Sequence, residues 1–168
     1  MGEAGLLDDI HVELLDGELI EMPAPGPDHQ YPIRKLLTIF VKRFDGRAIV
    51  DVNGPVQIDE YSVPIFDLAL LALRDDDDRK RRPGATGPLL VVEVAVSSLR
   101  YDRGRKVAAF ACNGVREVWI VDMIDRRVER HADLIAGTYA TLEYISKGGT
   151  IAPRAFPSEA IDVDEFVP

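Results

Sequence analysis

One segment near the N-terminus carries its apolar residues at the spacing of an amphipathic helix. Between positions 28 and 44 they recur at i, i+3, i+4, i+7, i+8 and i+11, which places them on one helical face. Asp28 can cap this helix, Pro32 is tolerated in its first turn, and Asp45-Gly46 ends it. The apolar positions are Ile33, Leu36, Leu37, Phe40, Val41 and Phe44.

Elsewhere the apolar residues form short runs between turn residues, a pattern typical of β-strands. Residues 11–21 predict a hairpin, because two apolar segments flank the favoured turn Asp16-Gly17. A second helix is expected over 99–113, ended by Gly114. This order predicts an α+β fold, close to α/β, with a mixed central sheet flanked by helices and an N-terminal β-hairpin. The expected strands are 48–53, 56–58, 65–73, 89–96, 115–122, 127–132 and 138–145, followed by a short turn or helix at 161–168.

Length and composition narrow the class of protein. A chain of 168 residues is expected to form a single domain over 1–168, and 46% hydrophobic residues exclude a largely disordered chain. One cysteine, Cys112, excludes an intrachain disulfide. No apolar run approaches the ~18 residues that span a bilayer, and the acidic N-terminus is unlike a signal peptide. We therefore expect no membrane association and a cytoplasmic location.

The charge distribution bears on possible partners. A net charge of −9 weighs against nucleic acid, because phosphate contacts depend on lysine and arginine. Basic residues nevertheless gather between positions 100 and 106. The run DDDDRKRR at 75–82 balances its acids with its bases, so it is expected to be a solvated loop, with phosphate contact as the alternative.

Two carboxylates stand inside strongly apolar segments. Asp67 lies within VPIFDLALLAL, and Glu93 lies within PLLVVEVAV. A buried carboxylate is costly unless it is paired, hydrogen-bonded or bound to a metal. If the two strands are neighbours, the two acids could share Mg²⁺ or Mn²⁺, which prefer oxygen ligands. The alternative is that each acid pairs with an arginine at the edge of the sheet.

Lys106 lies at the border of the apolar stripe of the second predicted helix. Its stem could rest on the sheet while its ammonium group reaches the strand acids. A lysine beside metal-binding carboxylates can stabilise negative charge that develops during hydrolysis. Taken alone, Lys106 could equally be a surface lysine.

Several segments, in this order, resemble the Uma-two family of restriction-endonuclease-like proteins. This family is abundant in bacteria and belongs to the PD-(D/E)XK nuclease superfamily. The resemblance covers about residues 11–145 and implies a mixed sheet flanked by helices. It rests on VELLDGELIEM, a proline-rich turn with DHQ, VPIFDLAL, VVEVAVSSLRYDRGRK, FACNGV and EVWIVD.

The resemblance implies a catalytic set of two acids and a lysine. Asp67 and Glu93 match the acids that hold a divalent metal, Mg²⁺ or Mn²⁺, which activates water against a phosphodiester. The superfamily motif places its lysine at position 95, where this chain has Ala95. Lys106 matches the position to which the lysine has moved in this family.

Four further residues are expected near this set. Glu18 matches an acid of the opening hairpin, and His29 matches a histidine near the first helix. Tyr101 and Asp102 match residues that lead into the second helix. Asp102 stands four residues before Lys106 and could orient it across one turn.

Two functions follow as hypotheses. The first is a Mg²⁺-dependent endonuclease-like hydrolase that acts on DNA as a homodimer. The second is a non-catalytic module of the same fold that binds a partner. The net charge favours the second hypothesis, as do Ala95 and Val96, whose side chains can donate no hydrogen bond to a metal-binding carboxylate. The complete set of Asp67, Glu93 and Lys106 favours the first.

Overall fold

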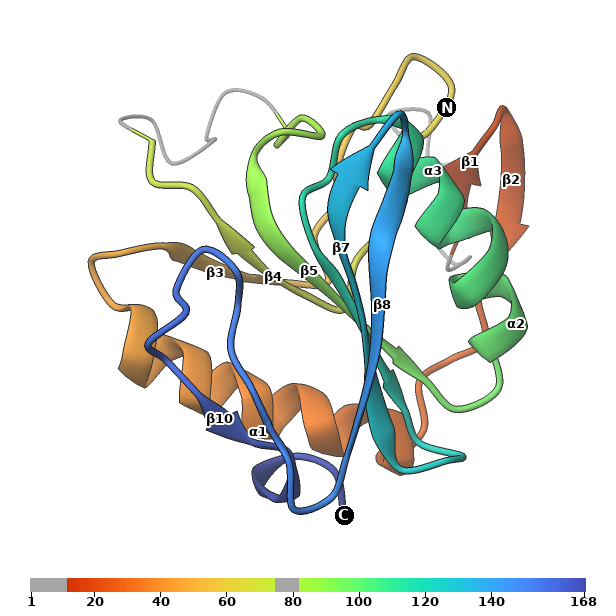
Figure 1. Ribbon diagram of the computed structural model, residues 1–168. Helices are drawn as coiled ribbons and strands as arrows, with labels where there is room; N and C mark the ends of the chain where they lie inside the picture. Colours follow the sequence, from red (N-terminus) through yellow and green to blue (C-terminus); the bar gives the residue numbers. More distant parts are fainter. Residues whose placement is uncertain (1–11, 75–81) are drawn as a thin grey trace.

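A six-stranded mixed sheet forms the centre of the molecule (Figure 1). The computed structural model describes residues 12–74 and 82–168, so most of the charged run at 75–82 lies outside the described residues. The strands stand in chain order and pair antiparallel, except that β5 and β6 are parallel. This arrangement confirms the predicted α+β class. The strands are β3 (Ile49–Val52), β4 (Leu68–Leu71), β5 (Pro88–Ala95), β6 (Val118–Asp122), β7 (Arg127–Ile135) and β8 (Thr138–Ser146).

The predicted N-terminal hairpin is present as β1 (Val12–Leu15) and β2 (Glu18–Glu21). Asp16 and Gly17 have φ of 53° and 78°, the two positive values that a tight hairpin turn requires. The hairpin attaches to the rest of the chain through Val63, whose backbone N–H donates to Leu14 O at 2.8 Å.

The first helix, α1 (Pro27–Phe44), covers one face of the sheet (Figure 1). Asp28 was expected to cap it, but the N-cap residue is Gly26, and Asp28 lies inside the first turn. Gly46, with φ of 67°, allows the turn that follows the helix. Val41 is 52% exposed, so the buried stripe is narrower than the apolar pattern predicted.

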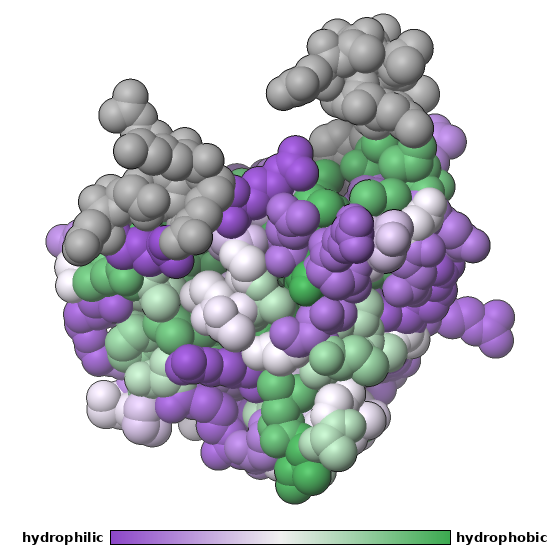
Figure 2. Space-filling view, turned by 90° about the horizontal axis from the view of Figure 1, so that it is seen from above, coloured by the Kyte–Doolittle hydropathy of each residue, from purple (hydrophilic) through white to green (hydrophobic). Residues whose placement is uncertain are grey.

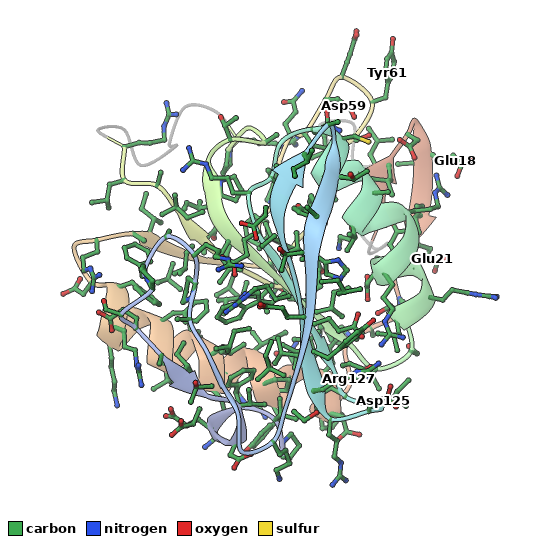
Figure 3. All side chains as sticks on the ribbon, viewed as in Figure 1. Glu18, Glu21, Asp59, Tyr61, Asp125 and Arg127 are labelled. Atoms are coloured by element: carbon green, nitrogen blue, oxygen red, sulfur yellow. The ribbon has the colours of Figure 1, made fainter. Side chains whose placement is uncertain are left out.

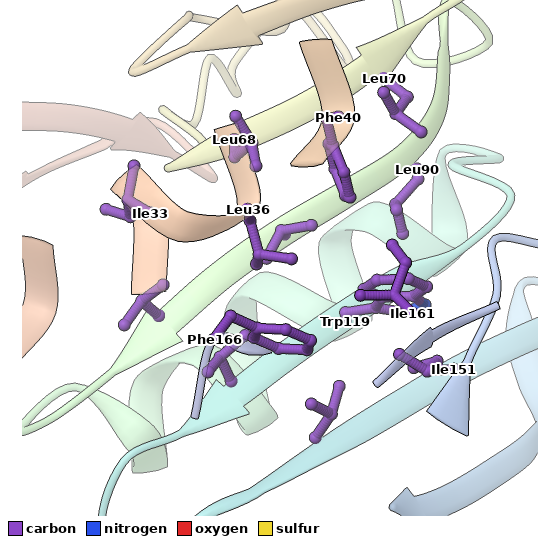
Figure 4. Packing of buried hydrophobic residues seen from close by; sticks show 14 of the residues in the cluster. Ile33, Leu36, Phe40, Leu68, Leu70, Leu90, Trp119, Ile151, Ile161 and Phe166 are labelled. Atoms are coloured by element: carbon purple, nitrogen blue, oxygen red, sulfur yellow. The ribbon is translucent and has the colours of Figure 1, made fainter. Parts of the chain in front are cut away.

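The buried face of α1 packs into the larger part of the core (Figure 4). Phe40 meets Trp119 edge to face, with 6.3 Å between ring centroids. Trp119 is fully buried on β6, and Phe166 closes the same cluster from the C-terminal end. The other members labelled in Figure 4 are Ile33, Leu36, Leu68, Leu70, Leu90, Ile151 and Ile161.

The second predicted helix is interrupted rather than continuous. It consists of α2 (Leu99–Tyr101), a π-helical turn η2 (Asp102–Lys106) and α3 (Val107–Cys112), and it lies on the face opposite α1 (Figure 1). Gly114 ends it as predicted, with φ of 90°. The N–H of Val115 donates to Phe110 O at 3.0 Å, which completes a Schellman end. A π-helical turn adds a residue to the helix, and such turns often occur at functional sites.

Two of the expected strands differ markedly in the structure. Residues 56–58 form no strand and only the isolated bridge Gln57–Gly84. The run 65–73 is paired regularly only over Leu68–Leu71, because the residues before it turn toward Gly54 and the hairpin. The C-terminal segment forms β9 (Thr150–Ile151), β10 (Ile161–Asp162) and the 3₁₀ turn η3 (Val163–Glu165), so the predicted turn is present but the two short strands were not predicted.

Hydrophilic residues and small apolar areas alternate on the face shown in Figure 2. Among the described residues, the model contains no helix that is both long and apolar enough to cross a bilayer. One pocket lies where β5 ends, and residues of α1 and η2 also line it.

Candidate active site

Asp67 and Glu93 come from adjacent antiparallel strands. Glu93 lies inside β5, and Asp67 directly precedes β4, whose Leu68 pairs with Val92. The backbone N–H of Val94 donates to Asp67 Oδ2 at 2.7 Å, so the first carboxylate is held against the second strand. Both carboxylates line one pocket. The structure thus brings together the two acids that stood isolated in apolar runs.

Lys106 joins these acids from the end of the π-helical turn. Its ammonium Nζ lies 3.0 Å from Glu93 Oε2, 3.2 Å from Glu13 Oε2 and 2.7 Å from the carbonyl oxygen of Ile65. The residue is only 1% exposed. Burial lowers the pKa of Lys106, but the charges of Glu93 and Glu13 outweigh burial and raise it. The lysine therefore remains protonated at neutral pH, and its ammonium donates hydrogen bonds to Ile65 O and Glu93 while forming an ion pair with Glu13.

Glu13 is a site residue that the sequence patterns did not single out. It lies on β1, is 2% exposed, and accepts hydrogen bonds from the Tyr101 hydroxyl and from the backbone N–H of Ile65. Glu13 stands two residues before the buried Leu15 and shares its side of the strand. That alternation was the available signal: a carboxylate at a core-facing strand position must have partners.

Glu18 does not reach the pocket. It lies on the outer side of the hairpin (Figure 3), where one carboxylate oxygen accepts a hydrogen bond from Arg105 Nη1 at 2.8 Å. Its side chain is 66% exposed. The hairpin does contribute an acid to the site, but from β1 rather than from β2.

His29 contacts the carboxylate of Asp67, and Tyr101 contacts the carboxylate of Glu13. His29 Nε2 lies 3.2 Å from Asp67 Oδ2, while its buried Nδ1 has no hydrogen-bond partner. Burial lowers the pKa of His29, but the hydrogen bond and charge of Asp67 raise it overall. Burial also raises the pKa of Tyr101, as does its hydrogen bond to Glu13. Tyr101 therefore remains a neutral hydrogen-bond donor.

Asp102 lies beside the site without pairing directly with Lys106. Its Oδ2 accepts a 2.5 Å hydrogen bond from the Ser98 hydroxyl, whereas Lys106 points to Glu13 and Glu93. Burial raises the pKa of Asp102 to about 6, and the Lys106 charge and the Ser98 hydrogen bond oppose this rise. The prediction that Asp102 orients Lys106 is therefore wrong, because Lys106 contacts Glu13 and Glu93 instead.

Replacing Asp102 by asparagine is expected to stabilise the protein at pH 8. The folded protein binds the Asp102 proton more tightly than the unfolded chain does, since its pKa rises from 3.8 to about 6. Stability therefore falls as pH rises through this interval, and Asp102→Asn removes that loss, about 1–3 kcal/mol at pH 8. Urea unfolding between pH 4 and 8 measures the effect. If the free energies of unfolding of the two proteins differed by the same amount at pH 4 and at pH 8, the prediction would be wrong.

The basic cluster at 100–106 is largely neutralised by acids. Arg103 donates through Nε to Glu129 Oε1 at 2.8 Å and through Nη2 to Asp122 Oδ2 at 2.8 Å. Both acids are buried. Arg105 instead binds Glu18 and Asp16 on the exposed side of the hairpin. These contacts neutralise much of the positive charge noted in the sequence of this segment. They also link η2 to β6, β7 and the hairpin.

Arg103 is expected to contribute more to stability than its neighbour Arg105. Arg103→Met leaves the buried Asp122 and Glu129 with the longer contacts of Arg127 and, for Glu129, of His131, at a cost of about 2–3 kcal/mol. Arg105→Met breaks only exposed ion pairs, which solvent screens, so it should destabilise the protein far less. Thermal and urea unfolding of the two variants test this difference. Equal destabilisation would mean that Arg103 does not anchor the turn.

The pocket around these residues has a volume of about 230 Å³. Its floor is charged, and one wall is the apolar segment 22–27 that leads into α1. Lys106 and His29 are the basic residues of this lining. The carboxylates outnumber them, which leaves an excess of negative charge. The lining acids are Glu13, Asp28, Asp67, Glu93 and Asp102.

The donor set fits a cation that is held partly by water. Glu93 Oε1 is buried without a hydrogen-bond partner, and Glu93 Oε2 already binds Lys106. Burial raises the pKa of Glu93 well above its ordinary value, against the charge of Lys106. A cation beside Oε1 would satisfy this oxygen and offset the surplus of negative charge. In the ranges 12–74 and 82–168, no three or more His, Cys, Asp or Glu side chains are arranged to hold a metal.

Comparisons with known proteins agree with this geometry. A solved structure described as a putative nuclease belonging to DUF820, from Anabaena variabilis, is similar, with a TM-score of 0.74. The alignment covers 93% of this chain and 89% of that one at 12% sequence identity, so it supports the fold alone. No curated protein matches the sequence. The family model Uma2, described as "Putative restriction endonuclease", matches residues 5–164. The chain therefore belongs to the Uma2 family of restriction-endonuclease-like proteins.

Proposed function

We propose that this protein is a Mg²⁺- or Mn²⁺-dependent endonuclease-like hydrolase that cleaves DNA phosphodiesters within one restriction-endonuclease-like domain over 1–168. One observation carries the proposal: Asp67 and Glu93 lie side by side in a pocket with a buried, charged lysine. Family membership supports nuclease activity, because the family model carries the description "Putative restriction endonuclease".

Asp67 and Glu93 would hold the metal through their remaining oxygens, with water in the other positions. The bound metal would polarise the phosphate and activate the attacking water. The chain's own residues prepare this site. Val94 N–H and His29 hold Asp67 in place, while Lys106 favours the ionised form of Glu93.

Glu13 completes the arrangement by holding the lysine. Glu13 accepts hydrogen bonds from the Tyr101 hydroxyl and the Ile65 backbone N–H, and these fix its position independently of its contact with Lys106. Held by Ile65 O, Glu13 and Glu93, Lys106 maintains the charge of the carboxylate site and does not extend freely into the pocket. It could contact a phosphate oxygen only by giving up one of these contacts.

A direct experiment is a cleavage assay with plasmid and oligonucleotide DNA. We expect cleavage with Mg²⁺ or Mn²⁺, its loss with a chelator, and its return when excess metal is added. Absence of cleavage, together with no Mn²⁺ binding by calorimetry, would favour the second function, a non-catalytic binding module. The neutralised arginines, the excess of acids in the pocket and Ala95 favour that alternative.

Homodimer formation and a cytoplasmic location remain predictions. Sedimentation velocity of the purified protein measures the first, and localisation of a tagged chain measures the second.

A further inference from the structure

The apolar wall of the pocket has no evident role in the fold. Residues 22–27, Met-Pro-Ala-Pro-Gly-Pro, contain no charged side chain, and positions 23–27 are exposed. None of them belongs to the two buried apolar clusters. Three prolines restrict the backbone, so the wall is held in shape at little entropic cost on binding. An exposed, preformed apolar wall beside a charged site indicates a ligand with both an apolar and a charged part.

The wall leads directly to the carboxylates. It begins after β2 and ends at α1, where Gln30 N–H donates to Gly26 O at 3.1 Å. His29 follows two residues after the wall and contacts Asp67. A phosphodiester placed at Asp67 and Glu93 would therefore have its own nucleotide next to residues 22–27. The apolar part that such a nucleotide offers is the face of its base.

The charges around the pocket weigh against duplex DNA. Duplex binding draws most of its affinity from lysine and arginine contacts to several phosphates. Among the described residues that line the pocket, Lys106 is the only lysine or arginine, and its ammonium contacts Glu13, Glu93 and Ile65. Arg103 and Arg105 are paired with acids. Affinity must then come from the metal and from apolar contact, and base faces are free for contact only where bases are unstacked.

We propose that the pocket takes one unpaired nucleotide of DNA, with its phosphate at Asp67 and Glu93 and its base against Met22, Pro23 and Pro25. The substrate class is therefore single-stranded or locally unpaired DNA. This inference rests on the proposed hydrolysis, since that reaction places the phosphate at the two acids.

Binding and cleavage are tested separately. Fluorescence anisotropy, with Ca²⁺ in place of Mn²⁺, compares a labelled single strand with the same strand annealed to its complement. We expect the single strand to bind at least about tenfold more tightly, because a duplex must first unpair and unstack the nucleotide that enters the pocket. Equal or tighter binding of the duplex overturns the proposal. If Mn²⁺ supports no cleavage of either form, the hydrolysis proposed above fails, while the anisotropy result still decides the form of DNA bound.

A pair of variants tests the wall itself. Pro23→Ser with Pro25→Ser should weaken single-strand binding about fivefold to tenfold and leave duplex binding and Mn²⁺ affinity unchanged. Pro157→Ser is the matched control, because Pro157 is also exposed but does not line the pocket. Circular dichroism checks that the variants fold. Unchanged single-strand binding by the folded wall variant overturns the assignment of the base to this wall.

Discussion

Replacing Lys106 by methionine is expected to reduce metal-dependent cleavage about 10²–10³-fold. The same change should lower the free energy of unfolding by about 3–5 kcal/mol, because it leaves two buried carboxylates without their shared cation. Glu13 and Glu93 are 2% and 3% exposed, so solvent cannot replace the lysine. Methionine keeps most of the side-chain volume, so the loss reports on charge rather than on a cavity.

Lys147→Met is the control for this substitution, because Lys147 is exposed on the turn after β8. It should change neither cleavage nor stability by a measurable amount. Calorimetry with Mn²⁺ on Lys106→Met separates charge maintenance from metal binding, and we expect binding to persist. Full cleavage by a stably folded Lys106→Met protein would show that this lysine has no part in the reaction.

Asp67→Asn is expected to abolish both Mn²⁺ binding and cleavage while the fold is retained. A neutral amide is a poor substitute for a charged oxygen ligand. The asparagine carbonyl can still accept from Val94 N–H, which holds the native side chain at 2.7 Å. Stability should therefore change far less than it does for Lys106→Met. Calorimetry, the cleavage assay and urea unfolding measure the three quantities on one protein sample.

Asp45→Asn provides the matched control, since Asp45 is an exposed aspartate at the end of α1. It should bind Mn²⁺ and cleave DNA as the parent does. If Asp67→Asn keeps the metal affinity of the parent, the metal is held elsewhere and the assignment of Asp67 is wrong.

Much of the candidate site could be predicted from short stretches of sequence. Asp67 and Glu93 each interrupt an apolar run, and burial of an acid requires a partner wherever the run folds. The helical position of Lys106 left open whether its ammonium group would reach the strand acids or the solvent, and the structure shows the contact with Glu93. The catalytic roles of these residues remain predictions.

Glu13 and Glu18 show where local patterns stop being sufficient. Both are glutamates of the same short hairpin, and a glutamate in a hairpin is most often a surface residue. Glu13 becomes buried because β1 faces the segment around Ile65 and the ammonium of Lys106. Glu18 remains exposed beside Arg105. The alternation along β1 marks Glu13 as a core-facing position, but the partners of both acids lie on segments far along the chain, which the hairpin sequence alone does not reveal.

Local patterns were enough to predict the periods of the helices and strands, the turns at Asp16-Gly17 and Gly114, and the presence of costly acids in buried strands. Those features depend on backbone preferences and on burial, which act over a few residues. Three other features arise from the packing of distant segments: η2 is π-helical, Arg103 and Arg105 are neutralised, and Lys106 lies between Glu13 and Glu93. An ion pair forms between whichever charged groups the packing brings within a few ångströms, and that proximity is a property of the whole fold.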